Sequence, residues 1–249
     1  MGIETGLIAL GTAIGTKDLI IKLLGPSIEF FGDELKEFNK RRLENIRKIF
    51  IKATEKVGQN IEKPGNVPPI ILKEIIETGS YYSDDIFIEY YSGILASSRS
   101  IKAKDDIGKV YTQLIHRLSY FQLKAHYIIY MKLKKSFDGM KNCELKSVRK
   151  TINIKFKGSE FNDIMEFSQD DLFKSYNIVG NILIGLSRED IIEKKWSLVG
   201  KIDGDYIFSV QPGLTGYRLF IWSQGQGDTL LEFLDKKLEF KSYDCIKME

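Results

Sequence analysis

The sequence has few of the residues that usually build a metal or redox site. It contains only two cysteines, Cys143 and Cys245, and only two histidines, His116 and His126. Two distant cysteines do not make the disulfide framework of a small secreted domain, and they are too few for a cysteine-based zinc site. The histidines do not stand in the HExxH spacing of a zinc-binding helix. We therefore expect reduced thiols, no bound metal and no cofactor.

Motifs for the common kinds of catalysis are also missing. The sequence has no GxSxG or SxxK serine motif and no GxGxxG or GxxxxGK[ST] phosphate loop. Paired carboxylates can bind metal or transfer protons, but each Asp-Asp pair here precedes an apolar run with helical spacing. An Asp at that place accepts hydrogen bonds from the first backbone N–H groups of the helix. We interpret the pairs as helix caps and expect no enzyme activity. The pairs are Asp84–Asp85, Asp105–Asp106 and Asp170–Asp171.

A long uncharged hydrophobic run is absent as well. The apolar segment 7–24 is interrupted by Lys17, Asp18 and Lys22, whereas a membrane-spanning helix needs roughly 20 largely uncharged residues. No basic leader marks a signal peptide. We therefore expect a cytoplasmic protein without a transmembrane helix.

The same N-terminal segment is rich in small residues at helical spacing. Gly6, Gly11 and Gly15 would give a helix over residues 6–24 a smooth face, which lets a neighbour pack closely. Close packing on the following helix is one interpretation. Contact with a second copy of the chain or with the surface of the inner membrane is the other.

What the sequence does contain is ordinary globular composition with a helical period. It is 43% hydrophobic and 29% charged, with a net charge of +3, so it can build one large or two small cores. Apolar residues at steps of three and four predict a long amphipathic helix over residues 26–57 and shorter helices up to about residue 137. We assign residues 1–138 to an N-terminal multi-helix domain.

The pattern of apolar and polar residues changes after the Asp138-Gly139 turn. Residues 148–157 alternate as a half-buried strand does, and residues 196–202 and 206–210 predict a hairpin. Helices are expected over about 170–186 and, from a capping-box pattern, from Ser187 through Ile192; residues 214–224 fit either helix or strand. We assign residues 139–249 to a smaller α+β domain, so the expected fold class is mainly α.

Basic residues gather on the long helix. They are candidates for contact with an anion or a partner, although interleaved glutamates such as Glu44 and Glu55 would also suit a simple solvated face. The basic residues are Lys40, Arg41, Arg42, Arg47, Lys48 and Lys52.

Part of the chain resembles a known family. The segments that carry the resemblance are Gly25-Pro26, Arg41–Asn45, Val67–Leu72, Ile75–Ser80, Tyr91–Ser97, Val110-Tyr111, Leu114-Ile115 and Leu118-Ser119. Together they look like the abortive-infection alpha (Abi-alpha) family of phage-defence proteins, over roughly residues 20–135. The resemblance implies an antiviral, phage-resistance function through protein or membrane contacts, and it supplies no catalytic residues. A protein partner or a homo-oligomer is the expected mode of action.

The C-terminal part suggests two alternatives to that function. The helix over 170–186, the hairpin around Asp203-Gly204 and the stretch from Leu214 are similar to a degenerate winged helix, which would make the protein a nucleic-acid-binding regulator. A DNA-reading helix usually carries several basic residues, and this one has Lys174 alone. The third alternative is a membrane-active toxic effector that works through its N-terminal helices.

Overall fold

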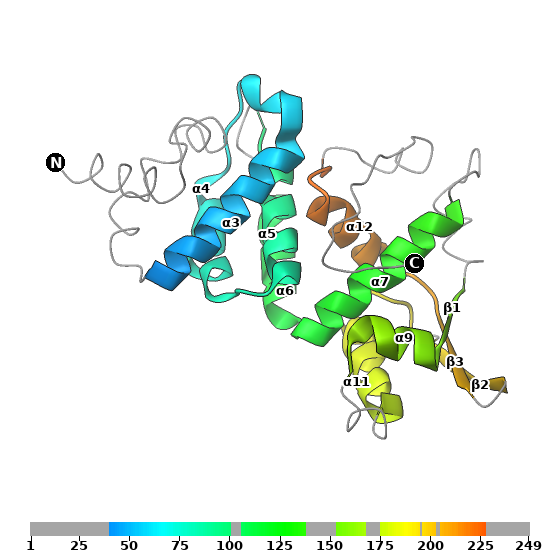
Figure 1. The fold of residues 1–249 in the computed structure, drawn as a ribbon. Coiled ribbons are helices and arrows are strands. Elements are labelled where there is room, and N and C mark those ends of the chain that lie inside the picture. Colours follow the sequence, from blue (N-terminus) through cyan, green and yellow to red (C-terminus); the bar gives the residue numbers. More distant parts are fainter. Residues whose placement is uncertain are drawn as a thin grey trace. The chain divides into compact units, whose positions relative to one another are not determined.

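A computed structural model describes residues 40–100, 106–137, 153–167, 175–194, 196–202 and 205–227 of the chain. Within these ranges the protein is mainly helical, with eight α-helices and one three-stranded sheet (Figure 1). The coarse part of the predicted fold class is thus confirmed. Contacts divide the chain into two units, which are described separately. Unit 1 comprises Met1–Arg117 with Ile221–Asp228, and unit 2 comprises Leu118–Phe220 with Thr229–Glu249.

Unit 1 is built from helices. Its elements are α3 (Lys40–Val57), η3 (Gly58–Glu62), α4 (Pro69–Glu77), η4 (Gly79–Tyr81), α5 (Asp85–Ser97) and α6 (Ile107–Arg117). The innermost is α5, in which every residue from Ile86 to Ser97 is buried, and α3 lies along it (Figure 1). α3 ends where Gly58 takes a φ of +56°, as the sequence predicts for a glycine after a helix.

Unit 2 combines helices with the small sheet. Its elements are α7 (Tyr120–Phe137), β1 (Ile154–Lys157), α9 (Gly158–Met165), α11 (Ser175–Arg188), β2 (Ser197–Ile202), β3 (Asp205–Val210) and α12 (Leu214–Ser223), whose last three residues belong to unit 1. The strands are antiparallel in the order β1-β3-β2. Phe156, Phe161 and Phe208 form an aromatic cluster between the sheet and α9, with ring centroids 4.9–5.6 Å apart.

By its contacts helix α7 belongs to unit 2, whereas the sequence assigns it to an N-terminal domain over residues 1–138. Residues from Leu123 to Tyr130 are buried on every side of the helix, because α9, α11 and β1 pack against it. The sequence of a helix that is buried on all sides does not indicate which elements pack against it. The sequence therefore could not show that α7 packs with α9, α11 and β1. Its start is fixed by a capping box, in which Ser119 N donates to Gln122 Oε1 and Gln122 N donates to Ser119 Oγ.

Most local predictions agree with the described residues. The strands β2 and β3 pair as the expected hairpin, and Leu214–Ser223 is helical, with Gly225 in the turn that follows at a φ of +78°. The short helix predicted through Ile192 is wrong. The chain turns at Asp190, which has a φ of +53°, and Ile192 forms a bridge with Pro212 instead.

Several predictions fall outside the described residues. They concern Gly6, Gly11 and Gly15, the helix over 6–24, the first part of the helix over 26–57, both cysteines and the chain after residue 227. Among the helices that are described, none is both long enough and apolar enough to cross a membrane.

Candidate functional site

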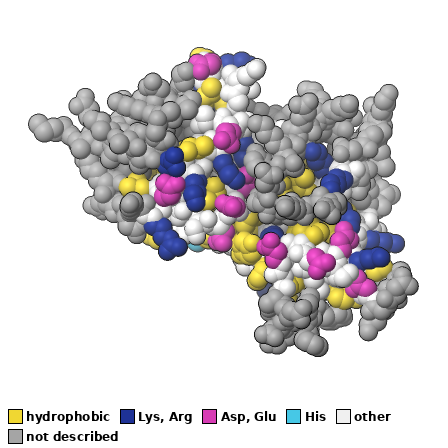
Figure 2. Space-filling view, in the orientation of Figure 1, with side chains coloured by type: hydrophobic (Ala, Val, Ile, Leu, Met, Phe, Trp, Pro, Cys, Tyr) yellow, Lys and Arg dark blue, Asp and Glu magenta, His cyan; other side chains and the backbone are white. Residues whose placement is uncertain are grey.

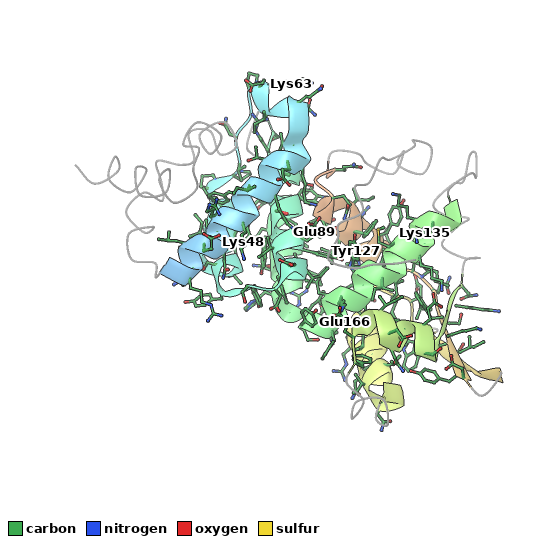
Figure 3. All side chains as sticks on the ribbon, viewed as in Figure 1. Lys48, Lys63, Glu89, Tyr127, Lys135 and Glu166 are labelled. Atoms are coloured by element: carbon green, nitrogen blue, oxygen red, sulfur yellow. The ribbon has the colours of Figure 1, made fainter. Side chains whose placement is uncertain are left out.

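The basic residues predicted on the long helix serve different purposes in the structure. Arg42 donates from Nε to Ser80 Oγ at 3.0 Å and lies over the Tyr81 ring at 4.1 Å. Arg47 pairs with Glu44 at 3.1 Å, and Lys52 reaches a carboxylate of α5. Arg41 and Lys48 are exposed and, seven residues apart, share one side of α3; Lys48 is labelled in Figure 3.

Cations and anions alternate over α3, as Figure 2 shows on the face it presents. Such mixing weakens the attraction of this surface for a polyanion. Contact of Arg41 and Lys48 with an anion or a partner stays a prediction, while the side chain of Lys40 lies outside the described residues.

A buried ionic cluster in unit 1 escaped the sequence reasoning. The carboxylate of Glu89 on α5, which is labelled in Figure 3, is fully buried and accepts hydrogen bonds from Lys52 Nζ, at 3.2 Å, and from Lys56 Nζ. The side chain of Lys56 is itself only 2% exposed. The only signal in the sequence was a lone acidic residue inside the apolar run Ile86–Tyr91. A buried carboxylate needs such partners, because an unpaired charge in a protein interior is very costly.

The two histidines lie in different units and make no joint site. His116 is exposed, with Nδ1 3.5 Å from the Tyr82 hydroxyl. His126 is completely buried in unit 2, where its Nε2 donates to the Gly216 carbonyl at 2.8 Å. Burial lowers the pKa of His126 to about 4, so the ring is neutral at physiological pH. Among the described residues no group of His, Cys, Asp and Glu side chains is placed to hold a metal ion.

The Asp pairs stand at helix starts as far as they are described, but the side chain of Asp84 does not cap its helix. Asp84 occupies the N-cap position of α5 without a side-chain cap bond, and Asp106 directly precedes α6. Asp105, Asp170 and Asp171 lie outside the described residues. The predicted position is therefore confirmed for Asp84–Asp85, whereas the capping hydrogen bond of Asp84 is not formed.

An acidic residue that the sequence reasoning passed over does cap a helix. Asp205, at the start of β3, accepts hydrogen bonds from Ser159 N at 3.2 Å and from Ser159 Oγ at 2.6 Å, in the first turn of α9. The hydroxyl of Ser159 is the main cause that holds the pKa of Asp205 below its usual value. No local signal could reveal this contact, because the two residues are 46 positions apart.

Helix α11 has one exposed face, on the side opposite its buried residues. The face consists of Asn177, Asn181, Ile184 and Arg188, all exposed and at helical spacing. On the opposite side Val179, Ile182, Leu183 and Leu186 are buried. Ile184 is 40% exposed, and a Cβ added at Gly180 would meet no atom within 4 Å. The face therefore offers an apolar centre between amide and guanidinium groups, and we call it the α11 face.

The comparisons with known proteins found no similar protein. No family model, no curated protein and no solved structure matches the chain. The function therefore has to be argued from the geometry of the described residues and from the resemblance in the sequence.

Proposed function

We propose that the protein is a phage-defence protein of the abortive-infection type, which acts by binding a protein partner through the α11 face of unit 2. The observation that carries the binding part is the order of elements in unit 2. Helix α7, strand β1, helices α9 and α11 and the hairpin of β2 and β3 follow one another, with the sheet order β1-β3-β2. A winged helix connects its elements in this order, and its third helix is the one that recognises the partner. In the order of unit 2 the third helix is α11.

The composition of the α11 face favours a protein over a nucleic acid. Affinity for DNA comes largely from lysine and arginine contacts to phosphates, and the α11 face has one cation, Arg188, beside an exposed Ile184. The connection between β2 and β3, which would be the wing, has the sequence Asp203-Gly204, and the negative charge of Asp203 would repel phosphates. Exposed apolar side chains with a polar rim are typical of protein interfaces.

A pair of matched substitutions tests the proposal in cells challenged with a panel of phages. Ile184 in the α11 face and Ile70 on α4 are exposed to nearly the same extent, 40% and 38%. We expect the wild-type gene to lower plaque numbers, Ile184→Glu to restore them, and Ile70→Glu to protect as the wild type does. Circular dichroism of the purified variants confirms that both are folded. Unchanged plaquing with the wild-type gene on every phage, without toxicity on overexpression, would refute the defence function.

Nucleic-acid binding is the second candidate, favoured by the same element order and by two asparagines on α11. Asparagine can form paired hydrogen bonds with adenine in the major groove. A gel-shift titration at low and moderate salt decides between the two, because phosphate contacts weaken steeply with salt. If the protein binds DNA at low salt, and if Asn181→Ala and Arg188→Ala abolish that binding, the partner of the α11 face is DNA rather than a protein. Absence of binding at low salt would exclude this candidate.

A membrane-active effector remains the third candidate, and it depends on residues 2–32, which lie outside the described residues. Co-sedimentation with liposomes, for the full chain and for a chain lacking residues 1–24, tests it. Equal and negligible pelleting of both would count against it.

A further inference from the structure

Helix α11 contains two glycines in its second half, and packing within unit 2 explains only one of them. A Cβ added at Gly185 would collide with the side chain of Gln122 on α7, whereas a Cβ added at Gly180 would meet no atom within 4 Å. A glycine inside a helix is less favourable than an alanine. Gly185 therefore gives α7 room to pack, while the space at Gly180 is used by no contact among the described residues.

Gly180 is part of a hole on the surface of α11. Residues at positions i, i+3, i+4 and i+7 of a helix surround a hole that can take one side chain of a facing helix. On α11 these four residues are all exposed or half-exposed, and the one without a side chain deepens the hole. They are Asn177, Gly180, Asn181 and Ile184.

A side chain that fits this hole lies on the same face. Ile184 is the large apolar residue of the α11 face and is 40% exposed. If two copies of α11 pack antiparallel across a two-fold axis, the same patch of each copy meets the other. Ile184 of one copy can then enter the hole of its partner between Gly180 and Asn181, and the partner's Ile184 does the same in return. The α11 face is thus complementary in shape to itself.

The polar ends of the α11 face also complement each other in the antiparallel arrangement. Arg188 lies one turn beyond Ile184 and would stand opposite Asn177 of the second copy. The guanidinium group has only donors, and the asparagine amide offers an acceptor oxygen, so a hydrogen bond can form at each end of the contact. A parallel arrangement would place the two copies of Arg188 side by side, and their like charges would repel. The position of the one cation on the α11 face therefore favours the antiparallel pair.

We propose that the partner of the α11 face is a second copy of this chain, packed antiparallel so that each Ile184 fills the space above Gly180 of the other copy. This inference rests on the proposed function, since it names the protein that binds the α11 face. The face consists of a few residues of one helix, whereas a standard interface takes roughly 20–30 residues from each partner. We therefore expect a reversible dimer with a dissociation constant in the micromolar range.

Analytical ultracentrifugation of the full chain over a wide range of concentrations measures the dissociation constant. We expect the wild type to dimerise and Ile184→Glu to stay monomeric, because each copy would bring a charge into the contact. The control is Ile70→Glu, at a site of nearly the same exposure on α4, which should dimerise as the wild type does. A wild type that is monomeric at every concentration would overturn the dimer, and so would an Ile184→Glu variant that dimerises normally.

Gly180→Ala separates the dimer contact from a purely structural role. Alanine favours the helix, so the variant should have a higher melting temperature at a concentration where the chain is monomeric. Its methyl group occupies the space that Ile184 of the second copy needs, and we expect the dissociation constant to rise by about tenfold or more, since overpacking occurs at both copies of the contact. A more stable protein with an unchanged dissociation constant would refute the contact between Ile184 and Gly180.

Cysteine substitutions test the antiparallel register. In a background with Cys143→Ser and Cys245→Ser, Asn177→Cys is made in one chain and Arg188→Cys in another. A short bis-maleimide should cross-link the mixture of the two chains much faster than it cross-links either chain alone, because only the mixed pair brings the two thiols together. Equal rates for the mixture and for the separate chains would contradict the antiparallel arrangement.

The dimer and the proposed function fail in different ways. If the chain stays monomeric while Ile184→Glu abolishes phage protection, the α11 face binds a different protein and only the dimer is refuted. If Ile184→Glu abolishes the dimer but protects against phages as the wild type does, the dimer stands and the proposed function is refuted.

Discussion

At the scale of single residues, the carboxylate of Glu89 is a buried charge in the core of unit 1. It is fully buried and binds two lysines of α3. Replacement of one partner of a buried ion pair usually costs about 3–5 kcal/mol, because the other charge stays buried. Replacement of both by apolar residues of similar size costs far less, since no charge is then left in the core.

We therefore expect Glu89→Gln to lower the free energy of unfolding by about 3 kcal/mol, since the ammonium of Lys56 would face a neutral amide. The double variant Glu89→Leu/Lys56→Met should recover part of that loss. Urea unfolding at neutral pH measures both. The control is Glu44→Gln, which removes the exposed partner of Arg47 and should cost less than about 1 kcal/mol. Equal losses for Glu89→Gln and Glu44→Gln would contradict the role given to the cluster.

The lowered pKa of the buried His126 makes the free energy of unfolding depend on pH. Its pKa is about 4 in the folded protein and 6.5 in the unfolded chain, so between these values the unfolded state binds more protons. The contribution of His126 to the free energy of unfolding is fully present above pH 6.5. It falls by up to about 3 kcal/mol as the pH drops from 6.5 to 4. Denaturant titrations at several pH values measure the slope. We expect His126→Gln to flatten it and His116→Gln, at an exposed site, to leave it unchanged; an identical slope in all three proteins would contradict the assignment.

At the scale of elements, α9 shows why a helix can be invisible in a sequence. Its residues Gly158–Met165 include glycine, serine, asparagine and aspartate, which are poor helix formers. Its first turn is completed by Asp205, and its apolar side is completed by Phe156 and Phe208 of the sheet. Tertiary contacts create the helix, whereas α4, α5 and α7 could be predicted from their own period and boundaries.

Asp205→Ala should therefore destabilise unit 2 by about 1 kcal/mol, the usual cost of a lost helix cap. The pKa of Asp205 is lowered in the folded state, so this contribution is present above the pKa of the unfolded aspartate and is lost as the pH falls through the lower folded value. Thermal unfolding at pH 7 and near pH 3 checks both parts. A difference between wild type and variant that is the same at the two pH values would show that the carboxylate charge is not involved.

In helix α11 we expect a substitution to raise the free energy of unfolding rather than to lower it. Glycine inside a helix is less favourable than alanine by about 0.5–1 kcal/mol, and a Cβ at Gly180 meets nothing. Gly180→Ala should raise the free energy of unfolding by that amount, as measured by urea titration. If the added methyl also weakens phage protection, the partner approaches the α11 face at Gly180. A destabilised variant would mean that this part of α11 is packed more tightly than described.

At the scale of the whole molecule, the sequence predicts the mainly helical class and the hairpin but not how the chain is shared between two units. Local period and turn residues are enough for α5, for α7 and for the pairing of β2 with β3. The predicted helix through Ile192 failed because Ile191 and Ile192 are fixed by the start of α12, through Gly213 N to Ile191 O and the Ile192–Pro212 bridge. The cluster of Glu89 with Lys56, 33 positions apart, needs the fold before it can be seen.

The discontinuity of unit 1 has a consequence for how the protein is made. A ribosome delivers α3 to α6 first, yet the residues Ile221–Asp228 of the same unit leave the exit tunnel only after all of Leu118–Phe220 has been synthesised. Domains generally begin to fold in the order of synthesis, so α3 to α6 start to fold before Ser97 Oγ can donate its hydrogen bond to Trp222 O. The nascent chain therefore completes its first unit only after most of the second has been made, and a protein truncated before Ile221 would never complete it.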